Sequence, residues 1–141
     1  MEDINELLQF NMSDTFILLF MICNHVVDDY YSQGILAKLK QKTWWRKQEE
    51  YKEMYKYDYI VALVMHAFSW AFMIMLPLAL KEGLNVGGWF TVVLLINAVI
   101  HAFVDDFKAN KLKINLVVDQ SLHVLQICVT YILYFLIALR A

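Results

Sequence analysis

Residues 59–80, YIVALVMHAFSWAFMIMLPLAL, decide the fold class. The stretch contains no aspartate, glutamate, lysine or arginine, and His66 lies inside it. An α-helix needs about 20 mostly apolar residues to cross the hydrocarbon core of a bilayer, so this stretch predicts a transmembrane helix. Residues 88–107 and 116–139 have a similar length and character and predict two further spans.

A fourth span is predicted over residues 14–34, although its two halves differ. Residues 15–23 are apolar, whereas the next ten residues read NHVVDDYYSQ. Ser13 and Asp14 are suitable N-caps, and Gly34 is a suitable helix end. Because nine apolar residues are too short to span alone, we expect the polar half to be buried against the other spans.

Composition supports one membrane domain. Sixty per cent of the 141 residues are hydrophobic and only 18% are charged. We therefore expect an all-α integral membrane four-helix bundle that occupies residues 1–141 as a single domain in contact with membrane lipids. The net charge of -2 and the confinement of the basic residues to connections exclude a nucleic-acid partner.

The connection between the first two spans predicts an amphipathic helix on the membrane surface, over residues 38–57. Its aromatic residues recur at helical spacing, and Glu49–Lys52 and Glu53–Lys56 are i,i+3 ion pairs. Trp44 and Trp45 are the expected membrane-surface anchors. Lysine and arginine concentrate in the first and third connections, so these are expected to be cytoplasmic, with both termini on the opposite side.

All four histidines of the chain lie inside predicted spans, with one in each span. Counted from the expected cytoplasmic ends of the spans, they lie seven to nine residues deep. At a rise of about 1.5 Å per residue, they share a depth of about 10 to 14 Å. The sequence therefore predicts one interior histidine layer, made of His25, His66, His101 and His123.

Three of these histidines have an aspartate four residues away, which places each pair on one helix face. The order is reversed in the last span, which also runs in the opposite direction to the first and third. All three aspartates are therefore expected one turn nearer the cytoplasm than the histidines. The pairs are His25 with Asp29, His101 with Asp105, and His123 with Asp119.

Two further acids, Asp28 and Asp106, are neighbours of the paired aspartates. They are expected to face the interface or solvent. His66 has no matching acid, because position 62 is alanine.

Charged side chains within spans usually face the bundle interior and indicate function. The alternative is a structural hydrogen-bond network, but such bonds contribute only about 0.6 kcal/mol each in membranes. Imidazole and carboxylate groups suit a divalent metal ion: zinc first, or manganese or iron with more oxygen ligands. Haem ranks lower, since the spans lack interior glycines and adjacent carboxylates suit it poorly.

The ordered motifs resemble a known family. H25xxxD29xxxQ33, a lone His66, H101xxxD105xxK108 and D119Q120xxH123 look like the small membrane proteins of bacteria and their phages known as domain of unknown function 3307. The resemblance implies a four-span protein of the bacterial inner membrane, in the cell or in a phage-infected host. It implies no activity, and it adds Gln33, Lys108 and Gln120 as matched positions.

The leading hypothesis is a membrane-embedded, metal-dependent hydrolase that acts at the cytoplasmic interface on a lipid-like substrate. The histidines would be metal ligands, and Asp29, Asp105 and Asp119 would be ligands or the catalytic base. One alternative is a proton or metal-ion conductor, although the outer halves of the spans show no continuing polar path. Another is a non-enzymatic interaction protein that binds a host partner or a second copy of the chain.

Overall fold

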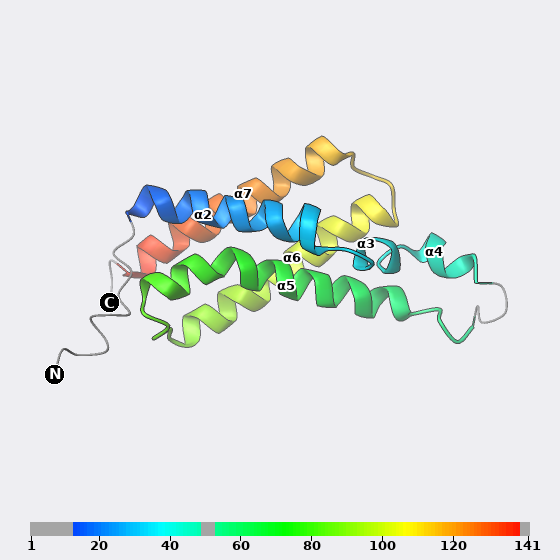
Figure 1. The fold of residues 1–141 in the computed structure, drawn as a ribbon, viewed down its shortest axis with the longest axis horizontal. Helices are drawn as coiled ribbons and strands as arrows, with labels where there is room; N and C mark the ends of the chain where they lie inside the picture. The colour runs from blue at the N-terminus through cyan, green and yellow to red at the C-terminus, as the bar shows by residue number, and fades with distance from the viewer. Residues whose placement is uncertain (1–12, 49–52, 139–141) are drawn as a thin grey trace.

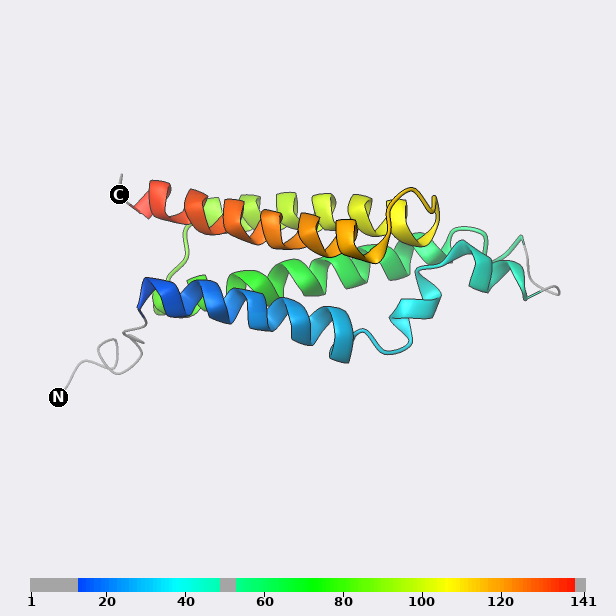
Figure 2. The same cartoon turned by 90° about the horizontal axis from the view of Figure 1, so that it is seen from above.

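The computed structural model describes residues 13–48 and 53–138, which are helical without β-strands. In chain order the helices are α2 (Asp14–Val26), the π-helix η1 (Val27–Ser32), α3 (Leu36–Leu39), α4 (Lys42–Arg46), α5 (Asp58–Lys81), α6 (Gly88–Ala109) and α7 (Leu116–Ala138). Figures 1 and 2 show α2, α5, α6 and α7 running alongside one another, with α3 and α4 at one end.

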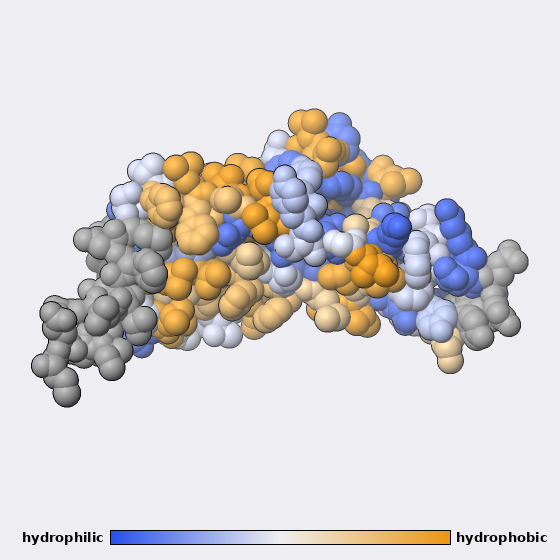
Figure 3. Space-filling model, viewed as in Figure 1, coloured by the Kyte–Doolittle hydropathy of each residue, from blue (hydrophilic) through white to orange (hydrophobic). Residues whose placement is uncertain are grey.

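Three of these helices, α5, α6 and α7, are long and apolar enough to cross a membrane. They coincide with the three regular spans predicted from the sequence. Large apolar side chains such as Val64, Ile96 and Phe103 are at least half exposed on their outward faces. Figure 3 shows hydrophobic residues over much of the visible surface, as expected for a protein surrounded by lipid rather than water.

The continuous helical segment formed by α2 and η1 begins and ends near the residues that the sequence predicts. The Ser13 hydroxyl oxygen accepts a hydrogen bond from the Phe16 amide at 3.3 Å and caps the helix. Gly34 has a φ of 49°, a left-handed conformation that glycine adopts without strain. The π-helical turn between them was not predicted. Its wider turn directs the adjacent carboxylates of Asp28 and Asp29 toward the interior, where both side chains are almost fully buried.

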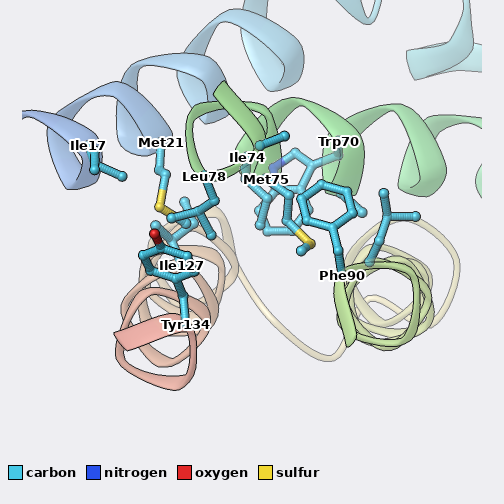
Figure 4. Close-up of a cluster of buried hydrophobic side chains, with 12 residues drawn as sticks. Ile17, Met21, Trp70, Ile74, Met75, Leu78, Phe90, Ile127 and Tyr134 are labelled. Atoms are coloured by element: carbon cyan, nitrogen blue, oxygen red, sulfur yellow. The ribbon is translucent and has the colours of Figure 1, made fainter. Parts of the chain in front are cut away.

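One half of the interior is an apolar core. It lies toward the N-terminal ends of α2 and α6 and the C-terminal ends of α5 and α7. Figure 4 shows its side chains pointing from all four helices toward one another. They include Ile17, Met21, Ile74, Leu78 and Phe90, all buried.

The connection between η1 and α5 differs from the single surface helix that we expected. Its backbone is extended at Gln41, which separates α3 from α4. Asn110 holds this break: its amide nitrogen donates to the Lys40 carbonyl at 3.1 Å, and its side-chain oxygen accepts from the Lys42 amide at 2.8 Å. The expected Glu53–Lys56 pair is present at 3.8 Å. The Glu49–Lys52 pair lies outside the described residues.

The two tryptophans of α4 lie away from the histidines. Trp44 and Trp45 contact each other edge to face, with ring centroids 4.8 Å apart. The Trp45 indole donates a hydrogen bond of 2.6 Å to the Leu39 carbonyl and so ties α4 back to α3. Their role as membrane-surface anchors stays a prediction.

Candidate metal site

The other half of the interior holds the predicted histidine layer. Each of α2, α5, α6 and α7 contributes one histidine, and all four side chains are buried. His101 and His123 stack with ring centroids 4.2 Å apart, and His66 lies 5.0 Å from His101. His25 lies 5.6 Å from His123. The common depth inferred from the sequence therefore corresponds to direct contact between the rings.

Asp105 lies at the centre of the cluster. Its Oδ2 atom is 3.3 Å from Nε2 of His66 and 3.7 Å from Nε2 of His101, while its Oδ1 atom is 3.6 Å from Nε2 of His123. Lys40 forms an ion pair with Oδ2 at 2.5 Å. One carboxylate thus contacts three of the four histidines.

Asp119 forms the expected pair with His123 on α7. Its Oδ1 atom lies 3.6 Å from Nε2 of His123, and its Oδ2 atom accepts a bond of 2.6 Å from Lys108. The separation of 3.6 Å is too long for a hydrogen bond. Oδ1 of Asp119 and both ring nitrogens of His123 are buried without a hydrogen-bond partner.

Asp29 forms neither a hydrogen bond nor an ion pair with His25 within the described residues. Asp29 instead lies 3.3 Å from Nε2 of His66 through its Oδ1 atom, while Oδ2 accepts a bond of 3.0 Å from Gln120. The physical reason is the π-helical turn between the two residues, which changes the i,i+4 register assumed for a regular α-helix.

His25 is bound on both ring nitrogens by protein groups. Nδ1 accepts a hydrogen bond of 2.8 Å from the Trp70 indole. The neutral ring therefore carries its proton on Nε2, which donates to Oε1 of Gln120 at 3.1 Å. In this arrangement His25 holds Gln120 in place. Its assignment as a metal ligand stays a prediction.

Asp28 corrects a second expectation, that it faces the interface or solvent. Its side chain is buried, accepts a hydrogen bond of 2.7 Å from Ser69, and lies 3.6 Å from Nδ1 of His66. This separation is too long for a hydrogen bond, and Oδ2 of Asp28 has no hydrogen-bond partner within the described residues. Asp106, by contrast, pairs with Lys111 at 3.3 Å at a partly exposed position.

Two residues at the centre of the cluster were missed by sequence reasoning. The Trp70 ring stacks on His101 with centroids 4.1 Å apart. Trp70 follows His66 by one helical turn, and this spacing could have indicated that both side chains lie on the same face. A tryptophan within a span is, however, equally compatible with an apolar core. Lys40 is buried although its surrounding sequence resembles a solvated connection, and only its contact with Asp105 explains this.

The three positions matched through the family resemblance also contact the cluster. Gln33 bonds to Asp29 at 3.1 Å and to His66 at 3.0 Å. Lys108 bonds to Asp119, and Gln120 joins His25 to Asp29 and Asp119. Residues that had no assigned role therefore hold the carboxylates in position.

The cluster contains three groups of residues that can hold a metal ion. Within each group the candidate ligand atoms all lie within 4.8 Å of one another. Ligands on a tetrahedral ion with bonds of about 2.1 Å lie about 3.4 Å apart, close to the observed separations of 3.3 to 3.7 Å. The groups are Asp29, His66 and His101; His101, Asp105 and His123; and Asp29, Asp119 and His123.

The charge balance of the interior also suits a cation. The carboxylates of Asp28, Asp29, Asp105 and Asp119 expose at most 5% of their side-chain surface. Lys40 and Lys108 neutralise two of them, so two negative charges remain. Because unpaired charge is expensive at membrane depth, a divalent cation or protonated histidines are needed to balance the cluster.

A cavity of about 350 Å³ opens onto the cluster. Asp29 and Asp105 line it together with Lys40, Lys108 and Gln120, and Leu112 and Leu116 form part of an apolar wall. Asp29 and Asp105 therefore lie at the wall of the cavity, whereas the four histidines are not among its lining residues.

Comparison with protein-family models, curated proteins and solved structures finds no match.

Proposed function

We propose that this protein is a membrane-embedded, metal-dependent hydrolase that acts at the cytoplasmic interface. The observation that carries the proposal is a pair of buried ligand atoms without hydrogen-bond partners, Nε2 of His123 and Oδ1 of Asp119, in a cluster whose Asp29 and Asp105 line an open cavity. Such atoms are expensive to bury unless a bound cation compensates them.

The fold proposal follows from the same cluster. The segment formed by α2 and η1 presents its polar face to α5 and α7. We propose that it completes a four-helix membrane bundle in the bacterial inner membrane, with both termini on the non-cytoplasmic side. We also propose that the chain is a member of the family known as domain of unknown function 3307.

The ligand types favour zinc, with manganese or iron as alternatives that more oxygen ligands would suit. A bound divalent cation supplies Lewis acidity and activates water at neutral pH. Asp29 and Asp105 line the cavity, where each would serve either as a ligand of the cation or as the acceptor of a proton from a water molecule. Lys40 and Lys108 offer positive charge to an anionic substrate, and the apolar wall suits the hydrocarbon part of a lipid-like molecule.

Metal analysis of the detergent-purified protein tests the proposal directly. The wild type is expected to retain stoichiometric metal, and the His101→Ala variant is expected to lose it. His25→Ala is the matched control, because His25 belongs to the same layer but has both nitrogens engaged by protein groups. Absence of metal from the wild type, after purification in zinc- or manganese-containing buffer, would reject the proposal.

The polar interior also extends deeper than the sequence indicated, which favours ion conduction as a second candidate function. Asn97 accepts hydrogen bonds from Gln126 at 2.8 Å and from Thr130 at 3.0 Å, all three residues being buried. This network lies one to two turns beyond the histidines, in a region expected to be apolar. Proton flux into proteoliposomes no greater than that of empty vesicles would dismiss conduction.

A further inference from the structure

The Asp105 carboxylate directs its two oxygens toward different histidines. Oδ2 lies within 3.7 Å of Nε2 of both His66 and His101, whereas Oδ1 lies 3.6 Å from Nε2 of His123. This is the arrangement of a carboxylate that bridges two cations. A carboxylate serving one cation would present both oxygens, or one of them, to a single group of ligands.

The Asp29 carboxylate is divided in the same way. Its Oδ1 atom lies 3.3 Å from Nε2 of His66, and its Oδ2 atom accepts from Gln120, which also bonds to Asp119. Asp29 accordingly belongs to two candidate groups, one with His66 and His101 and one with Asp119 and His123. Apart from Asp29, these two groups have no residue in common.

Electron lone pairs converge on the His66 side of these bridges. Nε2 of His66 lies 3.0 Å from the Gln33 amide nitrogen and 3.2 Å from Nε2 of His101. The same His66 nitrogen also lies 3.3 Å from one oxygen each of Asp29 and Asp105. Two carboxylate oxygens and two imidazole nitrogens therefore meet near one point, and their lone pairs repel one another unless a cation or a ring proton lies between them.

The His123 side has its own unpartnered atoms. Nε2 of His123 and Oδ1 of Asp119 lie 3.6 Å apart, fully buried and without hydrogen bonds. They belong to a different point of the cluster from Nε2 of His66, because His66 shares no candidate group with His123 or Asp119.

We propose that the cluster binds two divalent cations, bridged by the carboxylates of Asp29 and Asp105. His66 and His101 are the terminal ligands of one ion, and His123 and Asp119 are those of the other. The inference rests on the proposed metal-dependent function and specifies its centre. Two ions about 3.5 to 4 Å apart can hold both the attacking and the leaving oxygen of a displacement at phosphorus.

The charge balance then indicates the class of substrate. One divalent ion neutralises the two negative charges left by the lysines, so a second ion gives an excess of two positive charges. A phosphate ester dianion would balance this excess, and the cavity places Lys40 and Lys108 beside Asp29 and Asp105 to receive it. We therefore assign phosphate esters as the substrate class.

The test is the number of ions bound per chain, measured by mass spectrometry of the purified protein equilibrated with Mn²⁺ or Zn²⁺, with and without inorganic phosphate. Two ions per chain are expected in the presence of phosphate, and one or two in its absence. One ion in both conditions would overturn the dinuclear centre while leaving the proposed metal-dependent function intact. No bound ion would overturn both.

Two variants locate the ions. Asp119→Asn is expected to retain one ion, whereas Asp105→Asn, which removes a bridge, is expected to lose both or to bind them without magnetic coupling in the Mn²⁺ electron paramagnetic resonance spectrum. Asp106→Asn is the matched control and should bind two coupled ions, since Asp106 pairs with Lys111 outside the cluster. Equal coupling in the Asp105 and Asp106 variants would contradict the bridge.

The substrate class has its own measurement. Inorganic phosphate is expected to increase occupancy of the second ion, and vesicles containing phosphatidic acid distinguish a lipid phosphate from the free anion. Binding of phosphate alone assigns a soluble phosphate ester, and binding of the vesicles alone assigns a lipid. Metal-dependent binding of neither probe would reject phosphate esters. Circular dichroism and gel filtration of each variant separate loss of a ligand from loss of the fold.

Discussion

The two halves of the helix interior are built on the same four helices with opposite chemistry. On α2, Ile17 and Met21 face the apolar half, and on η1, which continues α2, Asp28 faces the polar half. On α6, Leu94 lies in the apolar half and Asp105 in the polar half. The apolar half shows that these helices pack closely without buried charge. The ionisable residues of the polar half therefore require another reason, which we assign to cation binding.

Removal of one charge from the polar half should have the largest effect on stability. Lys40→Met leaves the Asp105 carboxylate buried without its ion-pair partner, and breaking such a buried pair costs about 3 to 5 kcal/mol. The measurement is the free energy of unfolding of metal-free protein in detergent.

The matched control for this change is Lys111→Met. Lys111 pairs with Asp106 at a partly exposed position, so the loss should stay below about 1 kcal/mol. The double variant Lys40→Met/Asp105→Asn should recover most of the stability, because no uncompensated charge remains. Similar losses for the two single variants would show that burial of the pair does not matter.

Truncation in the apolar half should destabilise the protein without affecting metal binding. Ile74→Ala removes a fully buried side chain and is expected to cost about 2 kcal/mol. The value lies at the lower end for such changes because lipid, unlike water, does not drive apolar groups together. Ile96→Ala, on the outward face, is the control and should change the free energy of unfolding little. Metal bound per folded chain should equal that of the wild type in both variants.

The boundary between the halves can be tested at Trp70. Trp70→Phe retains an aromatic ring but removes the indole N–H that donates to Nδ1 of His25. Loss of one buried hydrogen bond is expected to cost about 1 kcal/mol. Unfolding of the variant is compared with that of Trp89→Phe, whose ring packs against the apolar core. Metal content should be unchanged, and its loss would assign His25 or Trp70 a direct role in holding the ion.

The smallest effect is expected in the Asn97 network, beyond the histidines. Thr130→Val retains the shape of the side chain and removes one hydrogen bond to Asn97, so about 0.6 kcal/mol should be lost. Thr91→Val on an exposed face is the control. A much larger loss, comparable with that of Lys40→Met, would show that the Asn97 network contributes as much to stability as the buried ion pair of the histidine cluster. The network would then count as part of the polar half.

The regular spans and the histidine layer were predictable because each depends on local sequence. Helix length and apolar composition defined α5, α6 and α7, and counting at 1.5 Å per residue placed His66, His101 and His123 at one depth. The His101–Asp105 and Asp119–His123 pairs followed from regular α-helical spacing. The same argument was wrong for His25 and Asp29, since a π-helical turn is not visible in residue spacing.

The sequence by itself determined that ionisable side chains would meet at one depth between apolar helices. Polar groups within the hydrocarbon core of a bilayer must be buried against protein rather than exposed to lipid. Only the tertiary structure decided which atoms meet: Lys40 reaches Asp105, Trp70 and Gln120 occupy the two nitrogens of His25, and Asp105 divides its oxygens between two histidine groups. These choices depend on helix rotation and on contacts between residues distant in the chain. Differences of a few ångströms in the distance between helices decide whether a side chain reaches the proposed cation or only a neighbouring residue. Residue spacing along one helix carries no information about these distances.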